Sequence, residues 1–162
     1  MNIETERLII KPLTLDDARR FSEYRDKEEV QSWDEYPLNK AINRIEYCQK
    51  HPFHGQIGNY QFGLYLKENN RLIGDIFIEI DGHTTFTLGY TLDSVYWSKG
   101  YASEALKSVF KAMHETYSFK ICLCHVYEDN IKSIRLLERN GFDKIHKSWF
   151  YQDVLYRKML NK

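Results

Sequence analysis

The sequence is poor in cysteine and has no long apolar run. Its 162 residues include three cysteines, at positions 48, 122 and 124. This small, odd number argues against a secreted disulfide framework and favours a reducing cytoplasm. Apolar runs end after three or four residues, as in 121–124, far short of a bilayer-spanning segment. The first residues contain neither a basic region nor an apolar stretch, so we expect no secretory signal, no membrane partner and a cytoplasmic location.

An excess of charge of either sign is also absent. Lys and Arg number 23, Asp and Glu number 23, and the formal net charge is zero. This balance argues against a protein that coats nucleic acid and against a polybasic membrane-surface binder. Only three prolines and eight glycines occur, so the chain is not of low complexity. Its length and its 43% apolar content predict one domain over residues 1–162 with a sizeable core.

Clusters of metal ligands are missing as well. Cys122 and Cys124 lie two apart on a strand-like run, so both point to one face, and we interpret them as small buried hydrophobes. Neither this pair nor His51 and His54 has partners at ligand spacing. We therefore expect no metal site.

The first half of the chain reads as strands with two helices between them. We expect a strand over 3–12, then a helix that starts at a capping box of Thr14 and Asp17 and buries Leu15, Ala18 and Phe21. A second helix is expected over 39–50. The later segments alternate and predict an antiparallel meander, with an Asp81-Gly82 turn before its last strand. Its three strands are 60–66, 72–80 and 86–92.

The second half changes to helical periodicity. One apolar face predicts a helix of about four turns, and its residues are Ala102, Ala105, Leu106, Val109, Phe110 and Met113. A buried strand follows at 121–126. Asn130 can cap another helix, with Ile131, Ile134 and Leu137 inward and Asn140-Gly141 at its end. Segments 142–147 and 154–160 close the chain as an antiparallel pair. This order predicts an α/β (α+β) fold, a mixed, mostly antiparallel sheet flanked by about four helices.

The junction between the strand at 86–92 and the helix after it carries the most informative residues. It reads Tyr96-Trp97-Ser98-Lys99-Gly100-Tyr101-Ala102-Ser103. A helix start presents unpaired N–H groups at the positive end of the helix dipole, where a pyrophosphate can bind. Gly100 and Ala102 would let the backbone approach the ligand, and Lys99 adds a positive charge. The alternative is an ordinary strand-to-helix turn. The junction matches neither a P-loop nor a dinucleotide fingerprint.

A second motif follows one strand later, as Asn130-x-x-Ser133-x-x-Leu136-Leu137-Glu138-x-x-Gly141-Phe142. With Gly89-Tyr90-x-Leu92 and the segment 96–105, it resembles the GNAT superfamily of acyl-CoA-dependent N-acetyltransferases. The resemblance is greatest to the branch of the ribosomal-protein N-terminal acetyltransferases, of which the opening Glu4-Thr5-Glu6-Arg7-Leu8 is also typical. It covers essentially the whole chain.

The resemblance implies acetyl-CoA as cosubstrate and no metal. It implies a sheet splayed between the fourth strand, 86–92, and the fifth, 121–126. The pantetheine arm of coenzyme A would pair with the exposed edge of the fourth strand. Asn130, Ser133 and Leu137 would lie along the pantetheine and thioester. The remaining cofactor contacts implied are Tyr90, Thr91, Leu92, Trp97, Ser98, Lys99, Gly100, Tyr101, Ala102 and Ser103.

Two positions depart from the family pattern. Ser98 replaces the Gly that is usual in the branch. Leu137 stands where many members have a Tyr that protonates the leaving thiolate, so the resemblance moves the general acid to Ser133. A role for Ser133 in capping its helix is the alternative.

The implied reaction is direct attack of a neutral amine on the thioester carbonyl, with the oxyanion held by a backbone N–H of the splayed strand. The sequence does not name the general base. Asp75, Glu79 and His125 are candidates on neighbouring strands, each with a structural or solvated role as the alternative, and an ordered water could also serve.

The acceptor would be a protein N-terminus or a small-molecule amine. The segment 14–36 contains eight acidic and four basic residues, which would favour a cationic amine or simply form a solvated face. Trp33 and Tyr36 could line an acceptor pocket, which the segment 147–153 could complete. Two other classes stay open: a catalytically silent CoA-binding module, and an interaction domain without cofactor. The family tends toward dimers, and this sequence leaves the oligomeric state, including a homodimer, open.

Overall fold

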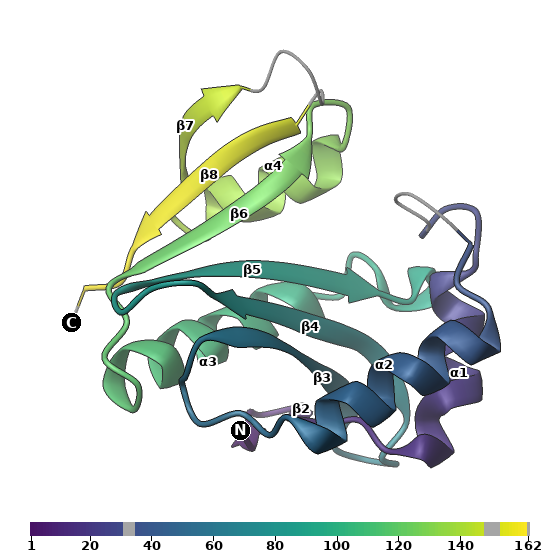
Figure 1. The fold of residues 1–162 in the computed structure, drawn as a ribbon. Helices are drawn as coiled ribbons and strands as arrows, with labels where there is room; N and C mark the ends of the chain where they lie inside the picture. Colours follow the sequence, from purple (N-terminus) through teal and green to yellow (C-terminus); the bar gives the residue numbers. More distant parts are fainter. Residues whose placement is uncertain (31–34, 148–152, 162) are drawn as a thin grey trace. The chain divides into compact units, whose positions relative to one another are not determined.

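The computed structural model describes residues 1–30, 35–147 and 153–161. The described residues form a mixed α/β fold with four α-helices, two short 3-10 helices and an eight-stranded, mostly antiparallel sheet in the order β1-β2-β3-β4-β5-β6-β8-β7 (Figure 1). This confirms the expected fold class. The elements are β1 Ile3–Glu4, β2 Leu8–Pro12, η1 Leu15–Asp17, α1 Ala18–Arg25, α2 Leu38–Lys50, β3 Gly58–Leu66, β4 Leu72–Ile80, β5 Thr85–Leu92, η2 Ser94–Tyr96, α3 Tyr101–Glu115, β6 Ile121–Tyr127, α4 Ile131–Arg139, β7 Asp143–Lys147 and β8 Asp153–Met159.

The contacts within the chain form two compact units. Unit 1 contains Met1–His54, Tyr60–Phe77 and Tyr90–Tyr101. Unit 2 contains Gly55–Asn59, Ile78–Gly89 and Ala102–Lys162. The expectation of a single domain over residues 1–162 stays a prediction.

The start of unit 1 differs from the single strand expected over 3–12. It forms two antiparallel strands, β1 and β2, in which Ile3 lies opposite Ile10. Thr5 makes the turn between them, since its N–H donates to the Leu8 carbonyl at 2.9 Å and its hydroxyl oxygen accepts from the Leu8 N–H at 2.9 Å. These local bonds compete with an extended ladder, which a pattern of apolar residues does not reveal.

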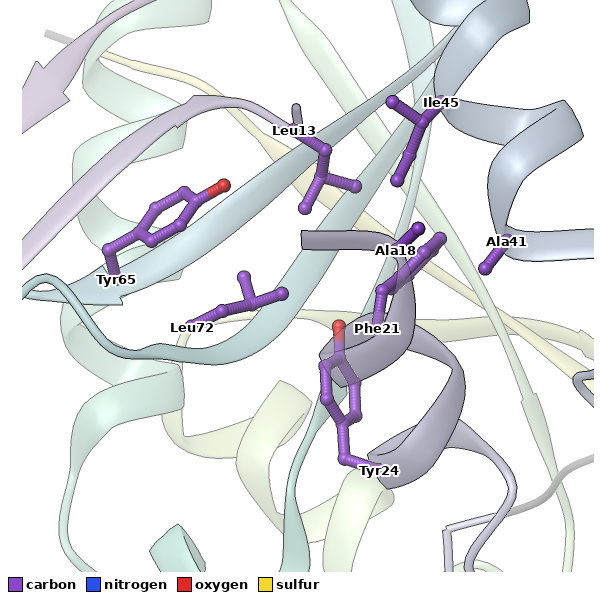
Figure 2. Packing of buried hydrophobic residues seen from close by; sticks show 8 residues of the cluster. All are labelled: Leu13, Ala18, Phe21, Tyr24, Ala41, Ile45, Tyr65 and Leu72. Carbon is purple, nitrogen blue, oxygen red and sulfur yellow. The ribbon is translucent and has the colours of Figure 1, made fainter. Parts of the chain in front are cut away.

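Helices α1 and α2 cover a cluster of buried apolar residues in unit 1 (Figure 2). The expected capping box is present, and the Asp17 carboxylate accepts from the Thr14 N–H at 2.8 Å. Ala18 and Phe21 are buried as predicted, but Leu15 is 47% exposed because it lies in η1, before the α-helix begins. The cluster consists of Leu13, Ala18, Phe21, Tyr24, Ala41, Ile45, Tyr65 and Leu72.

Unit 2 contains the end of the sheet and most of α3. β8 pairs antiparallel with both β6 and β7, as Figure 1 shows. β5 and β6, the predicted fourth and fifth strands, pair in parallel from Thr85↔Ile121 to Thr87↔Leu123. β5 then continues to Leu92. Cys122 and Cys124 are buried as expected, and burial raises the pKa of the Cys124 thiol to about 12.

The apolar faces of α3 and α4 confirm most of the expected helical periodicity, although Ala102 and Ile134 are only half-buried. The buried residues of α3 are Ala105, Leu106, Val109, Phe110 and Met113, all of them predicted. In α4, Leu136 and Leu137 are buried, whereas Ile131 is 49% exposed. Ile131 is the first residue of the helix. Its spacing placed it on the apolar face, but the side chain is exposed there.

Candidate functional site

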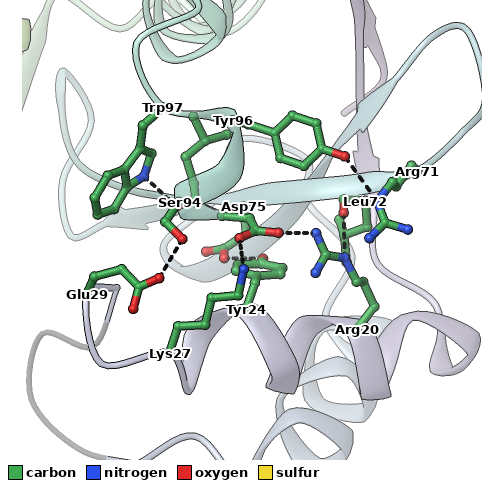
Figure 3. Close-up of polar contacts among 12 residues, drawn as sticks. Arg20, Tyr24, Lys27, Glu29, Arg71, Leu72, Asp75, Ser94, Tyr96 and Trp97 are labelled. Carbon is green, nitrogen blue, oxygen red and sulfur yellow. Dashed lines mark hydrogen bonds and ion pairs between the residues drawn. The ribbon is translucent and has the colours of Figure 1, made fainter.

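The loop after β5 is anchored at its base by backbone and side-chain bonds within unit 1. The Asp93 N–H donates to the Ile73 carbonyl at 2.8 Å, and the Tyr96 N–H donates to the Asp93 carbonyl at 2.9 Å. The Trp97 indole N–H donates to the Leu92 carbonyl at 2.8 Å. Arg71 Nε donates to the Tyr96 hydroxyl at 3.1 Å (Figure 3). These bonds hold the residues before Ser98 against the ends of β4 and β5.

A second anchor comes from the N-terminal strands. Arg7 Nη1 donates to the Lys99 carbonyl at 2.9 Å. Its guanidinium carbon lies 4.2 Å from the centre of the Tyr101 ring, a cation–π geometry. Arg7 thus holds both ends of the short segment that contains Gly100.

Between these anchors the backbone turns twice through the left-handed region. Ser98 has φ 61° and Gly100 has φ 80°. The side chains of 98–100 are exposed. In the described part of the chain, the N–H groups of Ser98, Lys99 and Gly100 have no hydrogen-bond acceptor. The segment therefore presents three backbone donors to solvent.

The first turn of α3 extends this row of donors along the chain. The first N–H groups of any α-helix lack a partner within the helix, which here applies to Tyr101, Ala102 and Ser103. They sit at the positive end of a dipole built from 15 residues. Such a row of donors is complementary to a phosphate or pyrophosphate group. These N–H groups belong to the backbone, so binding a phosphate there needs no side chain. Gly100 leaves the loop open at position 100, where an added Cβ would come to 3.4 Å from Arg7 Nη2.

Helix α4 places the residues of the second motif within unit 2. Asn130 is the N-cap as predicted, since its side-chain oxygen accepts from the Ser133 N–H at 3.2 Å. Ser133 thus takes part in the cap through its backbone. Leu137 has 0% exposed surface. Its side chain is part of the core, and its expected contact with the cofactor stays a prediction.

Asp75 on β4 is one of two buried carboxylates beside α1, and its side chain is 1% exposed. It accepts from the Tyr24 hydroxyl at 2.5 Å, from Arg25 Nη1 at 2.7 Å and from the Gln61 amide. Arg25 Nη1 also donates to the Thr91 hydroxyl at 3.1 Å. Burial and the neighbouring Asp75 charge raise the pKa of Tyr24 well above its ordinary value. These bonds indicate a structural role for Asp75, which the sequence analysis gave as the alternative to a role as general base.

Asp93 is the other buried carboxylate, also with a side chain 1% exposed. It pairs with Arg20 through one oxygen and with Lys27 at 2.5 Å through the other, and Figure 3 shows both cations reaching up from α1 and its C-terminal end. Burial alone would raise the pKa of Asp93, but the hydrogen bonds and charges of Lys27 and Arg20 outweigh it and hold the pKa below its ordinary value. No local pattern in the sequence indicated this cluster.

The acidic segment 14–36 is therefore not only a solvated face. Three of its four basic residues, Arg20, Arg25 and Lys27, bind buried carboxylates of β4 and of the loop after β5. Glu29 accepts from the Ser94 hydroxyl at 2.7 Å, and this bond is the first cause of a lowered Glu29 pKa. The segment thus fixes the base of the loop as well as carrying charge.

Two other candidate bases lie in unit 2. Glu79 is exposed on β4. The His125 side chain is 55% exposed on β6, and its Nδ1 lies 3.2 Å from Asp153 Oδ2 on β8. An imidazole held by a carboxylate and open to solvent has the geometry of a general base.

Of the two expected acceptor residues, Tyr36 packs against the core of unit 1. Its ring meets Phe21 edge-on at 5.1 Å between centres, and the Arg25 guanidinium lies 4.7 Å from its ring. Trp33 lies outside the described residues, as does most of the segment 147–153. Residues 148–152 are the undescribed part of that segment.

Residues 1–30, 35–147 and 153–161 contain no group of three or more His, Cys, Asp and Glu side chains placed to hold a metal ion. None of the helices in these ranges has the length and apolar character that a bilayer crossing requires.

Comparison with known proteins gives one consistent family. The sequence model of the acetyltransferase (GNAT) domain matches residues 7–143. "Probable N-acetyltransferase YjcK" of Bacillus subtilis is 32% identical over 150 residues, which cover 85% of this chain and 81% of the relative. The crystal structure of a GNAT-family acetyltransferase from Bacillus anthracis has a TM-score of 0.83 at 21% identity and covers 98% of both chains. Ribosomal-protein-S5-alanine acetyltransferase from Vibrio fischeri has a TM-score of 0.78 at 19% identity, over 99% of this chain and 97% of that one.

The α/β fold agrees with that of the GNAT structures. With the match over 7–143, the chain belongs to the GNAT acetyltransferase family.

Proposed function

We propose that this protein transfers an acetyl group from acetyl-CoA to a primary amine, on a protein N-terminus or a small molecule. The observation that carries the proposal is the row of N–H groups from Ser98 into the first turn of α3, which have no acceptor in the described residues. The loop is anchored by the backbone of Asp93 and by the side chains of Arg7 and Trp97. A pyrophosphate is the chemical group that such a row accepts.

The residues divide the binding of coenzyme A between them. In this proposal the pyrophosphate is bound by the loop and the first turn of α3, that is, by Trp97, Ser98, Lys99, Gly100, Tyr101, Ala102 and Ser103. The backbone of Tyr90, Thr91 and Leu92 pairs with the amides of the pantetheine arm. Support for the second part is that the β5–β6 ladder runs from Thr85 to Thr87 while β5 extends to Leu92.

Bound acetyl-CoA supplies an activated thioester, so the protein has to orient the amine and move protons. We assign the general acid to Ser133, whose backbone N–H serves the α4 cap through Asn130. For the base, the hydrogen bonds of Asp75 argue against that residue. The exposure of His125 and its contact with Asp153 favour His125.

The acceptor side of the proposal rests on unit 1. We assign Tyr36 and Trp33 to it. The branch of ribosomal-protein acetyltransferases is a finer proposal, supported by the motif from Tyr96 to Ala105 and by the fold shared with the Vibrio fischeri structure. A protein N-terminus is the acceptor that this branch predicts.

One assay tests the proposal in two stages. The melting temperature is measured against acetyl-CoA concentration, and a rise that follows ligand concentration indicates binding to the folded state. Release of free thiol is then measured with a panel of amino-terminal peptides, polyamines and other amines. No melting shift at millimolar acetyl-CoA contradicts the cosubstrate. Binding without thiol release from any amine contradicts the transfer reaction.

A further inference from the structure

Asn140, at the C-terminal end of α4, is a buried polar residue whose side chain reaches another helix of unit 2. It is 7% exposed. Its Nδ2 donates to the Leu136 carbonyl at 2.8 Å and to the Ser103 hydroxyl oxygen at 3.0 Å. Ser103 is the third residue of α3. One amide group thus links the end of α4 to the first turn of α3.

The chemistry of the partners fixes the direction of this bond. A carbonyl oxygen can only accept, so the group that faces Leu136 must be the NH₂ side of the Asn140 amide. The same nitrogen faces Ser103, whose hydroxyl oxygen therefore accepts. The proton of the Ser103 hydroxyl therefore points away from Asn140. It has no acceptor among the residues that the structure describes.

The amide oxygen of Asn140 gives a second, independent observation. Asn140 Oδ1 is buried and has no hydrogen-bond partner in the described residues. Buried polar atoms in folded proteins are nearly always paired, and an unpaired one calls for a ligand or a water. Asn140 Oδ1 needs a donor and the Ser103 proton needs an acceptor, so the polar group of these two residues is incomplete within the described residues.

We propose that Asn140 is a positioning residue for the cosubstrate: it holds the Ser103 hydroxyl so that its proton donates to a phosphate oxygen of coenzyme A. This inference rests on the proposed function. The hydroxyl adds a directed side-chain donor to the unpaired N–H groups of the α3 start, and donation to an ionised oxygen makes the bond a strong one. Asn140 does not touch the ligand phosphate and acts through Ser103.

The test is a double-mutant cycle on ligand affinity. Calorimetry measures the dissociation constants of CoA and of adenosine 3′-phosphate 5′-diphosphate, the CoA fragment that keeps the pyrophosphate. The variants are Asn140→Ala, Ser103→Ala and the double variant. We expect each single change to weaken binding about tenfold, the loss of one charge-assisted hydrogen bond. The double variant should bind no worse than Ser103→Ala. Ser103→Thr keeps the hydroxyl and should keep most of the affinity.

Gly141→Ala serves as the matched control for stability. Gly141 has φ 81° and ends α4 next to Asn140. An added Cβ there strains the backbone and comes to 2.8 Å from Lys158 Nζ, the end of a flexible side chain, with no atom of Ser103 within 4 Å. We expect a lower melting temperature for Gly141→Ala and an unchanged dissociation constant. If Asn140→Ala fails to fold, Asn140→Asp replaces it, since a carboxylate of the same shape accepts the Ser103 proton and should weaken binding further.

Three results would overturn the inference. Equal loss of affinity on removing Asn140 with or without the Ser103 hydroxyl would show that the two do not act together. If Gly141→Ala weakened binding as much as Asn140→Ala does, the effect of Asn140 would be on stability alone and not on the position of the Ser103 hydroxyl. Unchanged binding by both single variants, in a protein that binds CoA, would remove the hydroxyl from the site. Absence of CoA binding in the unaltered protein is a different outcome, because it contradicts the proposed function itself.

Discussion

Asp93 and the segment Ser98–Gly100 lie a few residues apart in one loop but differ in how their hydrogen-bonding capacity is used. Both Asp93 oxygens are paired, with Arg20 and with Lys27, and the side chain is 1% exposed. The N–H groups of Ser98, Lys99 and Gly100 are exposed and have no acceptor in the described residues. A saturated group stabilises the fold, whereas donors held in place without partners are prepared for a ligand.

This difference separates two kinds of mutational effect. Changes in the Asp75 and Asp93 cluster should lower stability and leave ligand affinity in the folded protein nearly unchanged. Changes at 98–100 should do the reverse. The four predictions below test that separation, beginning with the largest effect.

Asp93→Ala should cause the largest loss of stability. It leaves Arg20 and Lys27 beside a buried site without their carboxylate, which costs about 3 kcal/mol of unfolding free energy. Denaturant unfolding measures this loss. Because the folded-state pKa of Asp93 is lowered, its contribution is present above the ordinary carboxyl pKa and is lost as the pH falls through the folded-state value. The unaltered protein should therefore lose stability at acid pH more steeply than Asp93→Ala.

The comparison fails if Asp93→Ala folds normally but loses CoA affinity by more than about threefold, which corresponds to about 0.7 kcal/mol. That result would assign the buried carboxylate to ligand binding. Ligand titration below the melting temperature of the variant distinguishes this outcome from simple unfolding.

Gly100→Glu should cause the largest loss of affinity. It places a carboxylate among the unpaired N–H groups, and like-charge repulsion should weaken CoA binding by about 100-fold. Gly100→Ala is the matched control, because it adds the same backbone strain at φ 80° without the charge. Calorimetric titration of both variants measures the difference. Equal affinities for the two variants would contradict an anion site at this loop.

Ser133→Ala should lower kcat about tenfold with little change in CoA affinity. This lies below the usual range for a general acid because a thiolate is already a good leaving group. The α4 cap uses the Ser133 backbone N–H, which alanine retains, so the fold should keep its stability. Steady-state kinetics with the best amine measures kcat. An unchanged kcat would leave Ser133 without a role as acid.

Ser98→Gly should give the smallest effect. It relieves a serine held at φ 61°, and after the entropic cost of glycine the gain is about 0.5 kcal/mol. Ser118→Gly is the control, since Ser118 is exposed with φ 64°. Both changes should raise the melting temperature equally, and Ser98→Gly alone should alter CoA affinity. An equal effect of both on affinity would mean that the conformation of Ser98 does not matter for binding.

Most features with short-range causes were predicted correctly. Thr14 and Asp17 were expected to form a capping box, and Asn130 and Gly141 to begin and end a helix, because a cap involves residues three or four apart. The apolar face of α3 follows from helical periodicity for the same reason. The errors also concern local detail: Thr5 divides the first strand, and Leu15 and Ile131 are exposed at the beginnings of their helices.

Features with long-range causes were not predictable. Asp93 pairs with Arg20, 73 residues away, and Asp75 with Arg25, 50 residues away. Asn140 reaches Ser103 across 37 residues. No periodicity joins such pairs, so the sequence did not indicate that these side chains contact one another.

The sequence by itself determined the order of the elements, the two motifs and the family, because these depend on residues close together along the chain. Only the tertiary structure decided which polar groups are saturated and which keep a spare donor, since that depends on partners brought together by folding. It assigned Asp75 and Asp93 to the scaffold. Among the residues that the structure describes, it left the N–H groups of Ser98–Gly100 and the proton of the Ser103 hydroxyl without an acceptor.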